Sequence, residues 1–288
     1  AASALNGITM GIMVMGGPAL AGVLVALTGY AWTYSIDVVL MLANFLGLWS
    51  LPAIRPEGTI VRPGLESLRD GWRFLRRAAN IRLQFILDII AMTFGQPIAL
   101  FPAIGAVLLG GGAITTGVLT AAIAAGAFVC SVFSGPFGRV RRQGIGIERA
   151  IMVYGVAIGL FGLALLAGAL GAFAPETVDE GHPNVVIIAV AALALALAGA
   201  ADNVSSIFRN TMVQAAVPDA IRGRLQGIFI VVVTGGPRLG ALYAGTLATF
   251  TALWFPPLLG GMLIIALVAV LVRLSPRFRA YDAEHPVP

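Results

Sequence analysis

One arginine, Arg238, lies near the middle of an apolar stretch from Ile228 to Phe250 that holds no other charge. Reaching either surface of a bilayer from that depth is difficult, and an unpaired charge there is costly. We therefore expect Arg238 to face a water-filled cavity or a carboxylate: Asp88, Asp202 or a residue outside this chain. In that position it would bind an anionic substrate or bias the protonation of the carboxylate. The alternative is a purely structural charge pair.

Two aspartates in other apolar stretches are the candidates for proton chemistry. Asp88 lies about 8 Å into its stretch at 1.5 Å per residue. It either belongs to a coupling site or pairs structurally with Arg82 or Arg209. Asp202 precedes Arg209 by two helical turns, which we expect to be too far for a direct i, i+4 pair. Asp202 would then cap backbone amides or pair with an arginine from another loop, or it would form a gating ion pair.

Two amides accompany these charges as candidate substrate or coupling residues. Asn203 follows Asp202 directly, and Gln96 precedes Pro97 inside the third apolar stretch. Proline removes a backbone hydrogen bond and permits a kink. The Gln96–Pro97 step therefore combines a helix break with a polar group, and we expect it to line a cavity.

The sequence around Arg238 is repeated near the start of the chain. Gly235-Gly236-Pro237-Arg238-Leu239 matches Gly16-Gly17-Pro18-Ala19-Leu20, and Ala19 replaces the arginine. A helix that recurs after about half a transporter indicates a duplicated membrane protein. Small residues allow close helix packing, and proline permits a kink. We predict packing at both copies, and a hinge at Gly17, Pro18, Gly236 and Pro237.

Composition indicates a membrane protein. Hydrophobic residues make up 59% of the 288 residues and charged residues 11%, whereas soluble domains have roughly 25% charge. The net charge of +5 would suit nucleic acid, but the arginines lie in short loops between apolar stretches, so no nucleic-acid partner is expected. A single cysteine, Cys130, excludes a disulfide within the chain.

Signatures of enzymes and of ATP-driven pumps are missing from the sequence. The chain has no Walker phosphate loop, no paired-cysteine metal site and no nucleophile elbow. We therefore expect neither an enzyme nor a metal site, no cofactor and no ATP-binding subunit.

Eight apolar runs have the length of a membrane helix, about 20 residues. They are continuous rather than alternating, which favours helices over a barrel. The sequence thus predicts an all-α polytopic membrane protein. The eight spans are Ala4–Thr28, Trp32–Leu51, Leu83–Leu109, Ala113–Phe133, Ile147–Phe173, Val185–Phe208, Ile228–Phe250 and Pro257–Leu274.

Arginine distribution predicts the orientation. All 18 basic residues are arginines, and all but Arg238 fall in alternate loops or the C-terminal tail. The other loops have none, and one of them, Ala174–Asn184, is acidic. This positive-inside pattern predicts an inner-membrane protein with both ends of this chain in the cytoplasm.

Four segments follow from this arrangement. Residues 1–51 hold two helices of an N-terminal bundle, 83–274 hold a six-helix C-terminal bundle, and 275–288 form a cytoplasmic tail. Residues 52–82 are a cytoplasmic linker. Its spacing of Leu65, Leu68, Trp72 and Leu75 predicts an amphipathic helix on the membrane surface or, alternatively, against a partner.

Several local motifs resemble those of the major facilitator superfamily, in its enterobactin-exporter-like branch. Gly17-Pro18-Ala19-Leu20-Ala21-Gly22 resembles the exporter motif of helix five, departing from it at Ala21. The segment Gly135–Gly144, which contains Arg139, resembles the basic loop between helices eight and nine but lacks its usual Asp. Val213–Arg224, with the preceding Arg209, resembles the loop before helix eleven.

This resemblance implies that the chain corresponds to helices five to twelve, with an incomplete N-terminal bundle. We expect an N-terminal truncation, because the sequence lacks an initiator Met and begins at an apolar run. The implied function is proton-coupled export of siderophores by alternating access, with Arg139 and Arg209 as gating residues. Multidrug efflux is the alternative, and a non-transporting fragment or accessory membrane protein is the alternative of another class. The partners would be the lipid bilayer, a small-molecule substrate and protons.

Overall fold

The structure is a computed structural model, and among the residues it describes every regular element is a helix, as the continuous apolar runs predicted. It describes residues 24, 28–29, 31–47, 49, 65–135, 137, 140–173 and 178–284. The predicted first span, Ala4–Thr28, falls almost entirely outside this set. Gly17, Pro18 and Arg139 also fall outside it, so their expected roles stay predictions.

Five helical stretches in the described part are long and apolar enough to cross a bilayer. The first, Ala79–Leu108, consists of α3 (Ala79–Phe94), the 3₁₀ turn η1 (Pro97–Leu100), α4 (Phe101–Ala103) and the π turn η2 (Ile104–Leu108). The others are α5 (Gly112–Val132), α6 (Gln143–Ala169), α7 (Val185–Ala216) and α9 (Phe255–Arg273).

The described part of the chain contains further helices. The longest of them, α8 (Asp219–Phe250), has 32 residues and contains Arg238. A shorter apolar helix covers Ala31–Gly47. The remaining helices are α2 (Leu65–Arg77), in the stretch where an amphipathic helix was expected, and α10 (Pro276–Arg279). These bounds agree with an all-α membrane protein, whereas the count of eight spans stays a prediction.

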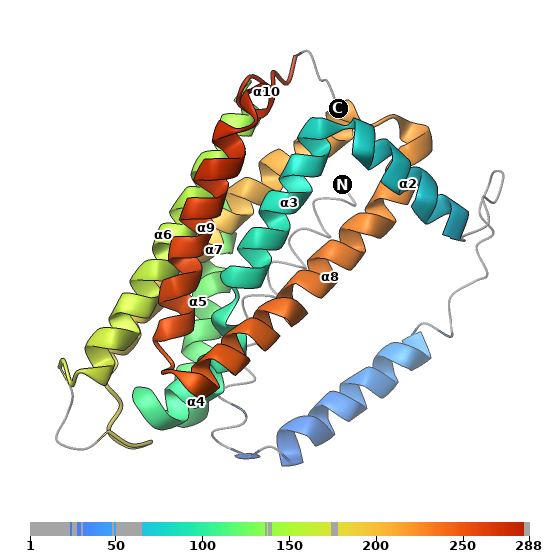
Figure 1. Ribbon diagram of the computed structural model, residues 1–288. Helices are drawn as coiled ribbons and strands as arrows, with labels where there is room; N and C mark the ends of the chain where they lie inside the picture. The colour runs from blue at the N-terminus through green and yellow to red at the C-terminus, as the bar shows by residue number, and fades with distance from the viewer. Residues whose placement is uncertain are drawn as a thin grey trace.

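The long helices form one bundle in which α7 packs between α5 and α6, and α9 packs against α6 (Figure 1). Helix α3 joins this group to α8, because it contacts both α8 and α9. Glycines set the closest approach. A Cβ on Gly126 of α5 would overlap the carbonyl of Ala196, and one on Gly199 of α7 would overlap that of Ile123. Such reciprocal contacts are typical of helices that pack in lipid.

Helix α3 breaks at the predicted Gln96–Pro97 step. Pro97 has no N–H and disfavours helical geometry in the residue before it, and Gln96 has φ −106° and ψ 80°. The break frees the carbonyl of Gly95, which accepts a 2.5 Å hydrogen bond from the Tyr154 hydroxyl of α6. A polar contact from a neighbouring helix therefore satisfies a backbone group that would otherwise be unpaired in lipid.

Helix α8 packs its Gly-Gly-Pro sequence against this broken part of α3. A Cβ on Gly240 would lie 2.7 Å from the Met92 carbonyl oxygen, and one on Gly236 would lie 2.8 Å from the Met92 Cβ. Gly235, in contrast, has open space where its Cβ would lie. The close packing expected of the glycines in this motif is therefore confirmed for Gly236 and for the neighbouring Gly240, but it is wrong for Gly235. Pro237 lies between them, inside a helix that continues on both sides.

Candidate functional site: a charge cluster between two helices

Helix α3 presents a row of polar side chains to the interior. Asn80, Gln84 and Asp88 follow one another at four-residue spacing and are 8%, 2% and 2% exposed. Residues four apart lie on one face of an α-helix. Helix α3 therefore has a polar, buried stripe, and Asp88 is the charged end of this stripe.

Helix α7 supplies the opposite charge. Asp202 and Arg209 lie seven residues apart, close to two full turns, so both side chains lie on the same face. The Nη2 atom of Arg209 is 3.4 Å from the Oδ1 atom of Asp202. This corrects the expectation that two turns are too far for a direct contact. That expectation took its limit from i, i+4 pairs, whereas an extended arginine side chain reaches along two turns.

Arg209 also forms an ion pair with Asp88 through its Nη1 atom, and so links α7 to α3. The side chains of Asp88 and Arg209 are only 3% and 10% exposed, whereas that of Asp202 is 38% exposed. Of the two partners considered for Asp88 in a structural pair, the structure therefore shows Arg209. We call these three residues the charge cluster.

The charge cluster holds two carboxylates and one guanidinium. With both carboxylates ionised, its net charge is one negative unit, and binding of one proton makes it neutral. Enclosing a net charge among apolar helices is costly, and the cost falls when the charges balance. The three side chains can therefore bind or release one proton while their net charge changes between zero and one negative unit.

A small cavity adjoins the charge cluster. Its lining includes Gln84, Asp88, Arg209 and Asn210, from both α3 and α7. Two polar atoms here, the Oε1 of Gln84 and the Nε of Arg209, have no hydrogen-bond partner among the described residues. The residues that line this cavity therefore retain hydrogen-bonding capacity that the described part of the chain does not use.

Arg238 does not belong to the charge cluster. Its side chain is exposed on α8, and it makes no ion pair within the described part of the chain. Both carboxylates that were candidates to pair with it are instead in contact with Arg209. The structure thus leaves Arg238 as a cation on an open helix face, and its expected role in binding stays a prediction.

The two predicted amides occupy different places. The Oδ1 of Asn203 accepts a 3.2 Å hydrogen bond from the Ser131 hydroxyl and so ties α7 to α5. The Nε2 of Gln96 lies 3.3 Å from the sulfur of Met92 of α3, in a partly buried position. Gln96 also lies beside Gly240, whose Cβ would be 3.3 Å from that of Gln96. Neither amide contacts the charge cluster through a hydrogen bond in the described part of the chain.

Sequence reasoning missed two groups that this arrangement uses. Gln84 was overlooked, although its position one turn before Asp88 inside an apolar run was a readable signal. Tyr154 was overlooked because a single tyrosine in an apolar helix belongs to no recognisable sequence motif. Its partner, the Gly95 carbonyl, becomes available only because α3 breaks there.

Comparisons with known proteins agree with this architecture. The chain matches a family described as transmembrane secretion effector over residues 1–288. It is 26% identical to a protein named enterobactin exporter EntS from Citrobacter koseri, over 100% of this chain and 64% of that protein. It is 29% and 30% identical to proteins of the same name from Shigella dysenteriae and Shigella boydii, over 96% of this chain and 62% of each relative.

The chain therefore spans less than two thirds of the length of these relatives. No solved structure matches it significantly. The family match over the whole chain, the all-helical fold and the membrane-length helices lead to one conclusion: the chain belongs to the transmembrane secretion effector family of the major facilitator superfamily, a group of membrane transporters rather than enzymes.

Proposed function

We propose that this chain is part of a secondary transporter in the inner membrane that exports a siderophore or a similar small amphiphilic molecule, driven by the proton gradient. The observation that supports it most directly is the charge cluster of Asp88, Arg209 and Asp202. Relatives named enterobactin exporters support the class of substrate. Both ends of this chain would lie in the cytoplasm, as the arginine distribution predicts.

Within this proposal, Asp202 takes up the proton. Its side chain is 38% exposed and lies 3.4 Å from Arg209, so water reaches it and its contact is long. Asp88 is enclosed and holds Arg209 in an ion pair. A proton on Asp202 neutralises the cluster, and Arg209 then forms an ion pair with Asp88 only. The neutral cluster can then be enclosed at lower cost while α3 and α7 change their solvent access.

The α3 break and the Gly-Pro step of α8 would form the pivot. Gly236 and Gly240 bring α8 into backbone contact with α3 beside Gln96 and Pro97. Breaks of this kind concentrate a change of backbone direction in a few residues. When the bundle rocks, the ends of the helices would move, whereas the packing at Gly240 would stay the same.

Arg238 would serve the substrate rather than the proton. It is exposed on α8 and has no carboxylate partner in the described part of the chain. A cation on an open face of a membrane helix attracts an anionic group of an amphiphile. Substrate binding and proton exchange would accordingly use different arginines of the same bundle.

An efflux assay in inverted membrane vesicles tests the proposal, with a fluorescent siderophore as substrate. A protonophore should stop uptake into these vesicles, and removal of ATP at a constant imposed proton gradient should not. Replacing Asp202 with Asn should abolish proton-driven transport, whereas Asp202→Glu should retain a measurable fraction. Transport that persists with protonophore and fails without ATP would contradict the mechanism.

The same assay separates the alternatives. A multidrug exporter would transport structurally unrelated amphiphiles and show little preference for a siderophore. An accessory membrane protein would transport neither, although it would insert normally. The exposed, apolar surroundings of Arg238 suit an amphiphile with an anionic group, and we therefore rank siderophore export first.

A further inference from the structure

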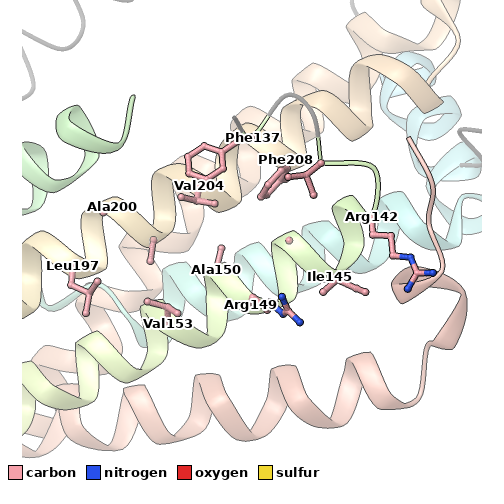
Figure 2. Close-up of a pocket in the computed structure, with 13 residues that line it drawn as sticks. Phe137, Arg142, Ile145, Arg149, Ala150, Val153, Leu197, Ala200, Val204 and Phe208 are labelled. Atoms are coloured by element: carbon pink, nitrogen blue, oxygen red, sulfur yellow. The ribbon is translucent and has the colours of Figure 1, made fainter. Parts of the chain in front are cut away.

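We propose that a groove between α6 and α7 binds an anionic phospholipid of the surrounding bilayer, with the lipid phosphate at Arg142 and Arg149. The groove has a volume of about 670 Å³ and is open along one side. It lies near the loop that joins α5 to α6, and Figure 2 shows apolar side chains of α7 facing α6, with both arginines on the α6 side.

The walls of the groove suit acyl chains. Val153 of α6 and Leu197 of α7 line it and are 42% and 44% exposed. Val204 and Phe208 extend the apolar wall along α7. The ring of Phe208 makes an edge-to-face contact with that of Phe137, at a centroid distance of 5.9 Å, and so closes one part of the groove. Exposed apolar surface on a membrane helix is surface that lipid covers.

The two arginines have no carboxylate partner among the described residues, although carboxylates lie nearby. Glu148 accepts hydrogen bonds of 2.7 and 2.5 Å from Arg279. The acidic groups of the tail, Asp282 and Glu284, both contact Arg141. The local carboxylates therefore pair with other arginines, and two positive charges remain at the edge of the groove.

The geometry of these charges favours a phosphate. Arg142 precedes the first residue of α6, Arg149 lies two turns later, about 10 Å along the helix axis, and both residues line the groove. The free amides at a helix N-terminus add partial positive charge to this end. Guanidinium groups bind phosphate oxygens in bidentate fashion, and basic pockets between membrane helices bind anionic lipid headgroups. A soluble anion would use the arginines and leave the apolar walls uncovered, so we assign the groove to a lipid.

This lipid site is separate from the charge cluster, although both use α7. Ala201 and Phe208 line the groove, and the residues that follow them, Asp202 and Arg209, form the cluster. Successive residues of a helix point about 100° apart. The same two turns of α7 therefore present one face to lipid and another to Asp88 of α3.

Native mass spectrometry of the purified protein in detergent tests the assignment. The probes are phosphatidylglycerol, which is anionic, and phosphatidylethanolamine, which is zwitterionic. We expect the wild type to retain phosphatidylglycerol preferentially, and the double variant R142Q/R149Q to bind it roughly tenfold more weakly, because both phosphate-binding charges are lost. The matched control R76Q/R77Q removes the same charge from exposed positions of α2 and should keep the wild-type affinity.

A second variant tests the apolar walls without changing the charge. Ala200 lines the groove, and Ala200→Leu should fill part of it and lower phosphatidylglycerol retention while both arginines remain. If R142Q/R149Q does not fold, Ala200→Leu still tests whether the groove binds the lipid. Equal retention of the two lipids by the wild type would overturn the proposal, as would equal losses in R76Q/R77Q and R142Q/R149Q. Binding of glycerol 3-phosphate as tight as that of the lipid would indicate a free-phosphate site instead.

Discussion

Arg209 and Arg238 both lie within long helices of one bundle, and the structure gives them opposite surroundings. Arg209 is 10% exposed and contacts two carboxylates, whereas Arg238 is exposed and makes no ion pair in the described part of the chain. From the sequence, Arg238 was the arginine that we expected to need a carboxylate partner. It lies near the middle of its apolar run, whereas Arg209 lies at the end of one. Depth in a run predicts that a charge is costly, but the helix face decides whether other protein groups can reach it.

The position of Arg238 on α8 explains the difference. Gly236 and Gly240 lie one turn apart and pack against α3. Arg238 lies two residues from each of them, which places it on the opposite face at about 100° per residue. That face also holds Val231 and Leu242, which are 65% and 66% exposed. The two faces of this helix therefore separate packing from exposed charge.

Removal of Arg209 should produce the largest effect on stability. Arg209→Ala leaves Asp88 enclosed without its cation, and breaking a buried ion pair costs about 3–5 kcal/mol. Thermal unfolding in detergent micelles measures the loss. A variant that also replaces Asp88 and Asp202 with Asn should recover much of it, because no enclosed charge remains. If Arg209→Ala is as stable as Arg238→Ala, the contrast between an enclosed Arg209 and an exposed Arg238 is wrong.

The two carboxylates of the charge cluster should differ in the same experiment. Asp88→Asn removes the enclosed partner of Arg209 and should cost roughly 2–3 kcal/mol. Asp202→Asn removes a half-exposed partner at 3.4 Å and should cost about 1 kcal/mol or less, because such pairs are screened by water. Transport should be lost in both. A larger loss of stability in Asp202→Asn would reverse the assignment of the proton-binding group.

Several parts of the fold could be predicted from the sequence because local physics determines them. Continuous apolar runs predicted the long helices, and Pro97 predicted the break in α3. The close packing of Gly236 and Gly240 followed from residue size. Each of these depends on a few neighbouring residues and on the absence of water in the bilayer.

The charge cluster could be predicted only in part. Asp88, Asp202 and Arg209 were all recognised, but their contacts depend on the rotation of α3 against α7 and on the reach of the arginine side chain. Gln84 joins the site through that same rotation. The hydrogen bond from Tyr154 to Gly95 needs α6 beside the α3 break, and no local pattern specifies that neighbour.

Two glycines of the same motif test which face of α8 is packed. Gly240→Val would place its Cβ 2.7 Å from the Met92 carbonyl oxygen, and overpacking of this kind costs about 1–3 kcal/mol. Gly235→Ala meets open space and should stabilise the helix by about 0.5–1 kcal/mol through helix propensity. Thermal unfolding of the two variants compares them directly. Similar losses in both would show that α8 is packed on every side.

Arg238→Gln should have the smallest effect on stability and still report on function. The side chain is exposed and has no ion-pair partner in the described part of the chain. The free energy of unfolding should therefore change by no more than about 0.5 kcal/mol. Membrane insertion should be normal. Siderophore efflux should nevertheless be lost, because the cation proposed to meet the substrate is gone, while Arg238→Lys should retain part of it. Normal efflux in Arg238→Gln would remove Arg238 from the mechanism, and a large loss of stability would mean that a carboxylate pairs with it after all.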